Sequence, residues 1–156
     1  MKKIYQLNNH GFSLMEIIVV IAIIGILASI IIVSLNSARE KANDATIKTN
    51  LTGTRNQAEL YFSENNNYGQ PSGIVSDCDE PNTIFDPNGS ISINKGIKSA
   101  EIKSFGLGSA VCSMSVDGKS WAVSVPLKKG GNWCVDSLGY SEEGITGFSS
   151  IGVCNH

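Results

Sequence analysis

The feature that most constrains this chain is an uncharged apolar segment, residues 17–35, with the sequence IIVVIAIIGILASIIIVSL. As an α-helix it is about 28 Å long at about 1.5 Å per residue, close to the about 30 Å of a bilayer's hydrocarbon core. We therefore predict a membrane-spanning helix. An ordinary secretory signal has a shorter apolar core before its cleavage site, although Ala28-Ser29-Ile30 resembles such a site. Lys2 and Lys3 predict an amino terminus in the cytoplasm, with the chain after about Asn36 outside.

A carboxylate, Glu16, directly precedes this segment. An ionisable group at membrane depth is costly and by default functional, and the next cation after it, Arg39, is about 34 Å further along a helix. A cut between Gly11 and Phe12 would create an α-amino group four residues before Glu16, in the same chain or a neighbour. The open alternative is a carboxylate that extends to the cytoplasmic interface of a plain single-pass anchor.

The motif Gly11-Phe12-Ser13-Leu14-Met15-Glu16, followed by the apolar segment, resembles the signature of type IV pilins and pseudopilins. The resemblance implies that a prepilin peptidase and methylase cuts after Gly11 and methylates the Phe12 amine. It also implies that Glu16 pairs with the Phe12 amine of the adjacent subunit during assembly. Many pilins have a proline near Val33-Ser34, where the helix loosens in the filament. This chain has none, which leaves local melting there open, although Gly25, Ser29 and Ser34 are weaker helix formers that could bend the helix.

The helix is predicted to continue to about Glu64 as an amphipathic one, until the turn-forming sequence ENNNYGQP ends it. The stretch AELYFSENNNYG resembles the helix end of major pseudopilins. One apolar stripe at helical spacing is expected to pack on a globular head: Ile47, Leu51, Thr54, Ala58, Tyr61 and Phe62. The charged residues of the other faces are expected to be solvated: Arg39, Glu40, Lys41, Asp44, Lys48 and Glu59.

Four cysteines lie in the second half of the chain, and none has the CxxC spacing typical of zinc or redox sites. Beyond a membrane segment they favour two disulfides in an oxidising compartment. Cys78–Cys112 and Cys134–Cys154 are the favoured pairs because each closes a moderate loop. The other two pairings stay open.

The head is predicted to be an antiparallel meander. A short strand is expected at residues 91–93, then strands within 110–116, 120–127 and 132–137, with turns at Asp117-Gly118 and residues 128–131. Trp121, Val123 and Val125 alternate with Ala122 and Ser124, which indicates a half-buried strand. Trp133 beside Cys134 is interpreted as core, and the Lys128-Lys129 turn as solvated.

The remaining candidates for chemistry are weak. The acids of the loop after the helix, Asp77, Asp79, Glu80 and Asp86, suggest calcium, but their spacing differs from an EF-hand loop. His10 lies in the leader and His156 ends the chain, so a serine or cysteine nucleophile lacks an evident base. We expect no enzymatic activity, cofactor or metal. Without its first eleven residues the chain has ten basic and fourteen acidic side chains, so no direct nucleic-acid binding is predicted.

The predicted fold class is α+β, the type IV pilin fold: a long N-terminal helix packed on a small antiparallel β-sheet head with two disulfides. The predicted divisions are a leader (1–11), a transmembrane or filament-core helix (12–36), its amphipathic half (37–66) and a globular head (67–156). The favoured function is a structural subunit of a type IV pilus or similar filament. The alternatives are a pseudopilin of type II secretion or DNA uptake and a membrane-anchored binding module that does not polymerise. Expected partners are the prepilin peptidase and methylase, other pilin subunits, an inner-membrane assembly platform and the lipid bilayer.

Overall fold

The computed structural model describes residues 11–70, 78–144, 148–150 and 152–155. The chain divides into two compact units, residues 1–38 and 39–156, and the first helix contributes to both. The elements are α1 (Leu14–Asn65), α2 (Asn94–Lys103), β1 (Val111–Met114), β2 (Trp121–Pro126), β3 (Asn132–Asp136), β4 (Ser141–Gly144), β5 (Phe148–Ser150) and β6 (Val153–Cys154). The predicted helix and the predicted fold class, a long helix with a small antiparallel sheet and two disulfides, are confirmed.

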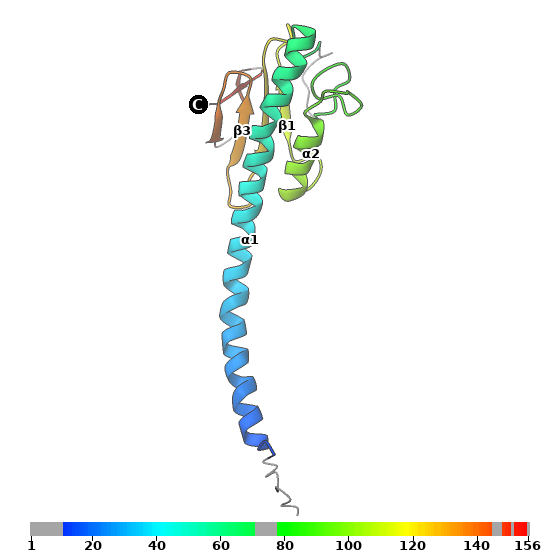
Figure 1. Ribbon diagram of the computed structural model, residues 1–156. Coiled ribbons are helices and arrows are strands. Elements are labelled where there is room, and N and C mark those ends of the chain that lie inside the picture. The colour runs from blue at the N-terminus through cyan, green and yellow to red at the C-terminus, as the bar shows by residue number, and fades with distance from the viewer. Residues whose placement is uncertain (1–10, 71–77, 145–147, 151, 156) are drawn as a thin grey trace, which may run out of the picture. The chain divides into compact units, whose positions relative to one another are not determined.

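The head, which is the unit of residues 39–156, is built on the second half of α1 (Figure 1). The predicted stripe forms the helix side of its core: Ile47, Leu51 and Ala58 are completely buried, and Thr54 is nearly so. Tyr61 and Phe62 are partly buried against the same core. The apolar spacing of three and four residues therefore identified the packed face of this half of the helix.

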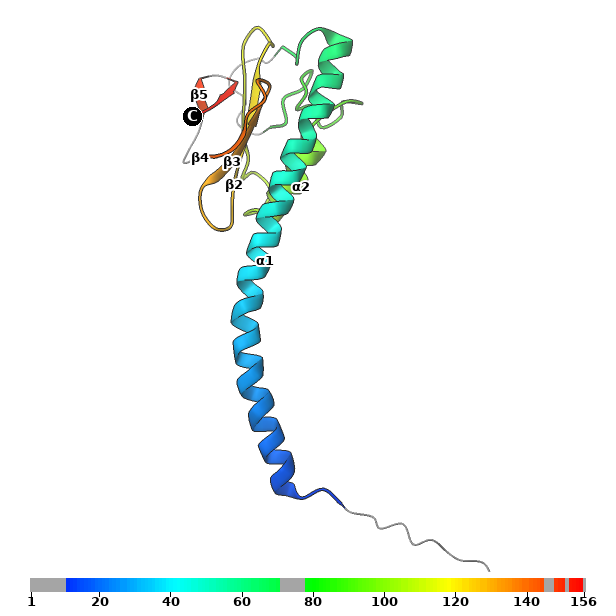
Figure 2. The same cartoon turned by 60° about the vertical axis from the view of Figure 1, so that its left-hand side comes forward.

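The four strands β1 to β4 form one antiparallel sheet in sequence order, which Figure 2 shows beside α1 and α2. Val123 in the middle of β2 lies opposite Cys112 of β1 and Val135 of β3. The β1–β2 turn contains Gly118 at a φ of +65°, a conformation that glycine adopts without steric cost. The predicted meander is confirmed, and β4 is an additional strand.

The prediction that β2 is half-buried is wrong, because Ala122 and Ser124 are buried as well as Trp121, Val123 and Val125. The ribbon of β5 and β6 covers the second face of the sheet, where Ala122, Cys134 and Cys154 form a small separate core with Phe148 packed against it. Strand alternation showed one buried face and gave no sign of the ribbon that buries the other.

The prediction of a strand at residues 91–93 is also wrong. Ile93 stands directly before α2, and its carbonyl accepts a hydrogen bond from the Ile97 N–H at 3.1 Å. Ile93, Ile97 and Ala100 are fully buried, and their spacing of four and three residues is that of a helix face. The short apolar run was therefore the start of a helix, an ambiguity that periodicity does not resolve in so few residues.

The disulfides of the structure join Cys78 to Cys112 and Cys134 to Cys154. The first ties the loop before α2 to β1, and the second ties β3 to the β5–β6 ribbon. They close loops of 34 and 20 residues. In the chain-entropy model, loops of this size stabilise a fold by about 3–4 kcal/mol each.

Two glycines allow a test of how closely α2 packs on α1. A Cβ at Gly96 would stand 2.5 Å from Cγ2 of Thr54, whereas a Cβ at Gly53 meets nothing within 4 Å. We expect Gly96→Ala to destabilise the head, since overpacking costs about 1–3 kcal/mol. Gly53→Ala should stabilise it by about 0.5–1 kcal/mol through helix propensity alone. Urea unfolding of the full chain in detergent, followed by tryptophan fluorescence, measures both, and stabilisation by both variants would contradict the close packing.

Candidate assembly site

The first turn of α1 is closed by two side-chain hydrogen bonds, one between Ser13 and Glu16 and one between Met15 and Ser13. The Ser13 backbone N–H donates to Glu16 Oε2 at 2.8 Å, and the Met15 N–H donates to the Ser13 hydroxyl oxygen at 3.3 Å. This is a capping box, which satisfies backbone donors that the start of a helix leaves unpaired. Sequence reasoning missed it, although the spacing Ser-x-x-Glu is its known signature. The carboxylate therefore has one partner inside its own helix end, whereas the expected partner was the Phe12 amine of the same chain or a neighbour.

Gly11 and Phe12 precede the first helical residue. Both are exposed, and the Phe12 side chain is 83% exposed. The peptide bond between them thus lies outside regular structure, the condition that a peptidase requires of its substrate. The leader residues 1–10, including His10, lie outside the described residues, as do Asp77 and His156.

The apolar residues of α1 in the first unit are uncovered. Along residues 17–35 the large side chains whose burial is described are between 45% and 66% exposed, as in Leu35 and Ile30. Among the described residues, α1 is the one helix that is long and apolar enough to cross a membrane by length and composition, with a mean hydropathy of 3.2 in its most apolar window. A patch this large is typical of a surface that lipid or another protein covers.

The second half of α1 holds the head through polar links that the sequence did not reveal. Asp44 is buried, and its two oxygens accept hydrogen bonds from the Lys128 and Lys129 N–H groups at 2.7 and 3.3 Å. Lys48 pairs with Glu143 at 2.8 Å and lies 4.8 Å from the centre of the Trp133 ring. The prediction that Asp44 and Lys48 are merely solvated is therefore wrong.

Arg55 provides a third link between α1 and the sheet. Its guanidinium donates to the Asp136 and Tyr140 carbonyls and to the Ser141 hydroxyl. Asp136 itself is completely buried, and its carboxylate accepts backbone N–H groups of Leu138, Tyr140 and Cys154. Trp133 packs partly buried against the main core. The segment of residues 133–136 thus serves the core and the strand connections, in line with its interpretation as core.

The acids considered for calcium make protein contacts of their own. Asp79 accepts from the Asn94 amide at 2.6 Å and pairs with Lys98 at 3.3 Å. Asp86 accepts the N–H groups of Asn88 and Asn82, and these bonds, the Asn88 one foremost, hold its pKa below the ordinary value. Within the described part of the chain, no three acidic, histidine or cysteine side chains form a metal-binding group.

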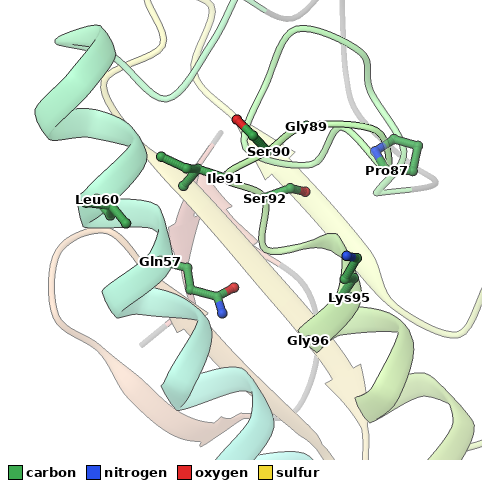
Figure 3. A pocket seen from close by; sticks show the side chains of 9 residues that line it. All are labelled: Gln57, Leu60, Pro87, Gly89, Ser90, Ile91, Ser92, Lys95 and Gly96. Atoms are coloured by element: carbon green, nitrogen blue, oxygen red, sulfur yellow. The ribbon is translucent and has the colours of Figure 1, made fainter.

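A cleft of about 300 Å³ lies between α1, the loop of residues 87–92 and the start of α2 (Figure 3). Figure 3 shows Gln57 and Leu60 on α1 across from Ser90 and Ile91 on the loop. Lys95 is the single charged side chain among the described residues that line it. The cleft therefore offers no carboxylate or imidazole to act as a base for its serines.

Tyr68 connects the loop after α1 back to the helix. Its hydroxyl donates to Glu59 at 2.8 Å, and its ring is buried at an edge-on contact with Trp121. Burial, followed by the hydrogen bond and the charge of Glu59, raises the pKa of Tyr68 to about 12. The neutral phenol is thus strongly favoured in the folded state.

This shift predicts a loss of stability at alkaline pH. The unfolded chain ionises Tyr68 near its ordinary pKa of 10.0, whereas the folded one retains the proton to about 12. The associated stability is fully present below pH 10.0 and is lost as the pH rises to about 12. Unfolding midpoints measured through this range should fall less steeply in Tyr68→Phe than in the parent. Tyr140→Phe, with a ring that is 40% exposed, is the control, and equal slopes in all three proteins would contradict the prediction.

Comparisons with known proteins agree with this geometry. Residues 6–32 match the prokaryotic N-terminal methylation motif. Over 61 residues the chain is 43% identical to the type IV wide pilus major component PilA4 of Thermus thermophilus. It is 38% identical over 61 residues both to the type II secretion system core protein G of Aeromonas hydrophila and to the type IV major pilin protein PilA of Myxococcus xanthus.

The aligned segment is 39% of this chain, and it covers 47%, 43% and 28% of those three proteins, so the chain spans less than half the length of the relatives it matches. No solved structure matches it significantly. The methylation motif, the relatives and the fold together support one class, a type IV pilin or pseudopilin. The resemblance of residues 11–16 to that class is confirmed.

Proposed function

We propose that this chain is a structural subunit of a type IV pilus or pilus-like filament, polymerised through the apolar part of α1. The observation that carries the proposal is the uncovered apolar surface of residues 17–35, headed by the carboxylate of Glu16. One helix with such a surface needs lipid before assembly and neighbouring helices afterwards.

The proposed sequence of events starts in the cytoplasmic membrane, with the amino terminus inside and the head outside. A prepilin peptidase removes residues 1–11 and methylates the Phe12 amine. Residues 12–36 then form the filament core, residues 37–66 carry the head, and residues 67–156 complete it at the filament surface. An inner-membrane assembly platform inserts the subunits. The relatives named as pilus and secretion components support this scheme.

Glu16 is proposed to pair with the Phe12 amine of the adjacent subunit. Its hydrogen bond with Ser13 uses Oε2, and a carboxylate has about four acceptor sites. One group is therefore able to cap its own helix and bind a neighbour's cation at the same time. In lipid or in a packed helix bundle, an unpaired charge costs several kcal/mol, so the pair would fix the axial register of the subunits.

A pseudopilin of type II secretion is the second candidate, and the protein G relative is the observation that favours it. Electron microscopy of the producing cells separates the two. Long surface fibres that contain this chain indicate a pilus. The absence of such fibres, together with loss of protein secretion in cells that lack this chain, indicates a pseudopilin.

The processing steps are tested by the intact mass and amino-terminal sequence of the protein from its native membrane. We expect a chain that begins at Phe12, carries one added methyl group on the amine and contains both disulfides. A chain that retains residues 1–11 in membranes and in filaments would contradict the processing. Uncut monomers that never polymerise would instead indicate a membrane-anchored binding module.

The two roles of Glu16 are separated by Glu16→Gln. Glutamine preserves the capping box, because its side-chain oxygen accepts the Ser13 N–H, but it removes the charge. We expect at least about a tenfold loss of assembled filament. A free-energy change of about 1.4 kcal/mol is a tenfold change in an equilibrium constant, and losing the proposed ion pair costs more than that. Quantitative immunoblots of sheared filaments against total protein measure the loss. Glu40→Gln, an exposed carboxylate elsewhere on α1, is the control, and normal assembly of Glu16→Gln would refute the pairing.

A further inference from the structure

One end of the head combines exposed apolar side chains with lysines. We call it the head base, and it comprises Ile102, Lys103, Phe105, Leu107, Lys128 and Lys129. Ile102, Phe105 and Leu107 are 65%, 65% and 67% exposed. They lie at the end of α2 and in the turn that follows it, where Figures 1 and 2 show α2 ending beside the β2–β3 turn.

Contacts join these two segments into one surface. The Ser104 hydroxyl donates to the Pro126 carbonyl, and Lys128 Nζ lies 4.3 Å from the centre of the Phe105 ring. The backbone N–H groups of Lys128 and Lys129 are held by Asp44 on α1. The head base is therefore fixed to α1 only a few residues after Arg39, where the helix enters the head.

Charge is distributed unevenly over the head. Three lysines belong to the head base, and Lys41 is exposed beside Asp44 on α1. Several carboxylates around them are engaged: Asp44 and Glu101 are buried and bind backbone N–H groups, and Glu143 pairs with Lys48, while Glu40 on α1 and Glu142 on β4 are exposed. The opposite end, around Asn66 and the β1–β2 turn, carries one lysine, Lys119, and mostly acids: Glu59, Glu64, Asp86 and Asp117. A basic end is thus present on a chain that is acidic overall.

We propose that the head base docks on the anionic phosphate headgroups of the membrane that the chain's own helix spans. Phe105, Leu107 and Ile102 would lie at headgroup depth, and the lysines would reach the phosphates, the pattern typical of surfaces that bind anionic interfaces. The inference rests on the proposed membrane insertion of residues 17–35. It adds a resting state for the subunit, docked before assembly and released when the subunit enters the filament.

The length of the connection supports this occupant. Asp44 is the ninth residue after Leu35, the last of the apolar segment, and even a fully extended link of that length spans only about 30 Å. Because Asp44 is bonded to the Lys128 and Lys129 N–H groups, Asp44 and the turn that it holds stay within about 30 Å of the end of the apolar segment even when the link is extended. Each lysine near an anionic surface contributes about fivefold to binding.

A tryptophan placed in the head base reports the docking. Phe105→Trp preserves an aromatic ring under the Lys128 amine, because an indole ring binds a cation at least as well as a phenyl ring does. Val116→Trp is the matched control, because Val116 is 77% exposed on the β1–β2 turn. That turn lies at the other end of the head, where Lys119 bonds to the Asn66 carbonyl, about 33 Å along α1 from Asp44. The full chain is reconstituted into vesicles of phosphatidylcholine with or without phosphatidylglycerol, using brominated acyl chains as quenchers.

The signal of each added indole is the difference in fluorescence between the variant and the parent chain. In vesicles with phosphatidylglycerol we expect the indole of Phe105→Trp to be quenched and that of Val116→Trp to be unaffected. Adding Lys128→Gln with Lys129→Gln to Phe105→Trp should lower the docked-to-free ratio by about 25-fold, at about fivefold per lysine. Raising the salt to about 1 M should weaken docking too, because the screening length falls from about 8 Å to about 3 Å.

The outcomes separate this inference from the proposed function. If the Phe105→Trp chain floats with the vesicles while its added indole stays unquenched, the docking alone is overturned, and equal quenching in Phe105→Trp and Val116→Trp overturns it as well. Shielding of the Phe105→Trp indole only in assembled filaments also overturns it, since the partner is then a second copy of the chain. A chain that does not float with the vesicles overturns membrane insertion and the docking with it.

Discussion

The structure depends on one constraint: within the first unit, the described part of the chain leaves the apolar surface of residues 17–35 exposed. The large apolar side chains are at least 45% exposed wherever their burial is described, so about half of their apolar surface or more contributes nothing to the stability of the isolated fold. At about 25 cal/mol per Å², such a surface is too unfavourable in water to stay free. The chain is therefore complete only in a lipid bilayer or among other helices, and the head has to be stable by other means.

The head achieves this with a thin core reinforced by covalent and polar links. Its apolar centre lies between the α1 stripe, α2 and one face of the sheet. The Cys78–Cys112 disulfide lies within this core, and the Cys134–Cys154 disulfide lies in the small second core on the other face of the sheet. Buried carboxylates fix loops in the same way at three places. Each one accepts backbone N–H groups of a turn or loop: Asp44, Glu101 and Asp136. Such bonds are charge-assisted and roughly twice as strong as neutral ones, so a few carboxylates fix segments that would otherwise need more apolar cover.

The parts of the fold that sequence predicted are those with a repeated local signal. The α1 stripe repeats over four turns, and the three central strands are separated by turns with glycine. α2 was missed because its apolar residues are few and Gly96 weakens the helical pattern. β4 was missed because its sequence, SEEG, has neither apolar alternation nor β-branched residues. The partners of Asp44 lie more than eighty residues away in the sequence, and those of Asp136 lie up to eighteen residues away. No local sequence pattern therefore indicated the roles of these two carboxylates.

The candidate assembly site was likewise predicted only in part from the sequence. Gly11, Phe12 and Glu16 stood out because a charge beside an apolar segment is anomalous in itself, whereas the capping box was visible in the sequence and was overlooked. Its presence changes the energetic argument for assembly. Transfer of an apolar helix from lipid to a bundle of similar helices gains little hydrophobic free energy, because lipid tails are as apolar as leucine. The choice of register must then come from polar groups, and a Glu16 carboxylate already held in place by Ser13 loses less side-chain entropy when it binds a neighbour's amine. The cap therefore preorganises the group on which specific assembly would depend.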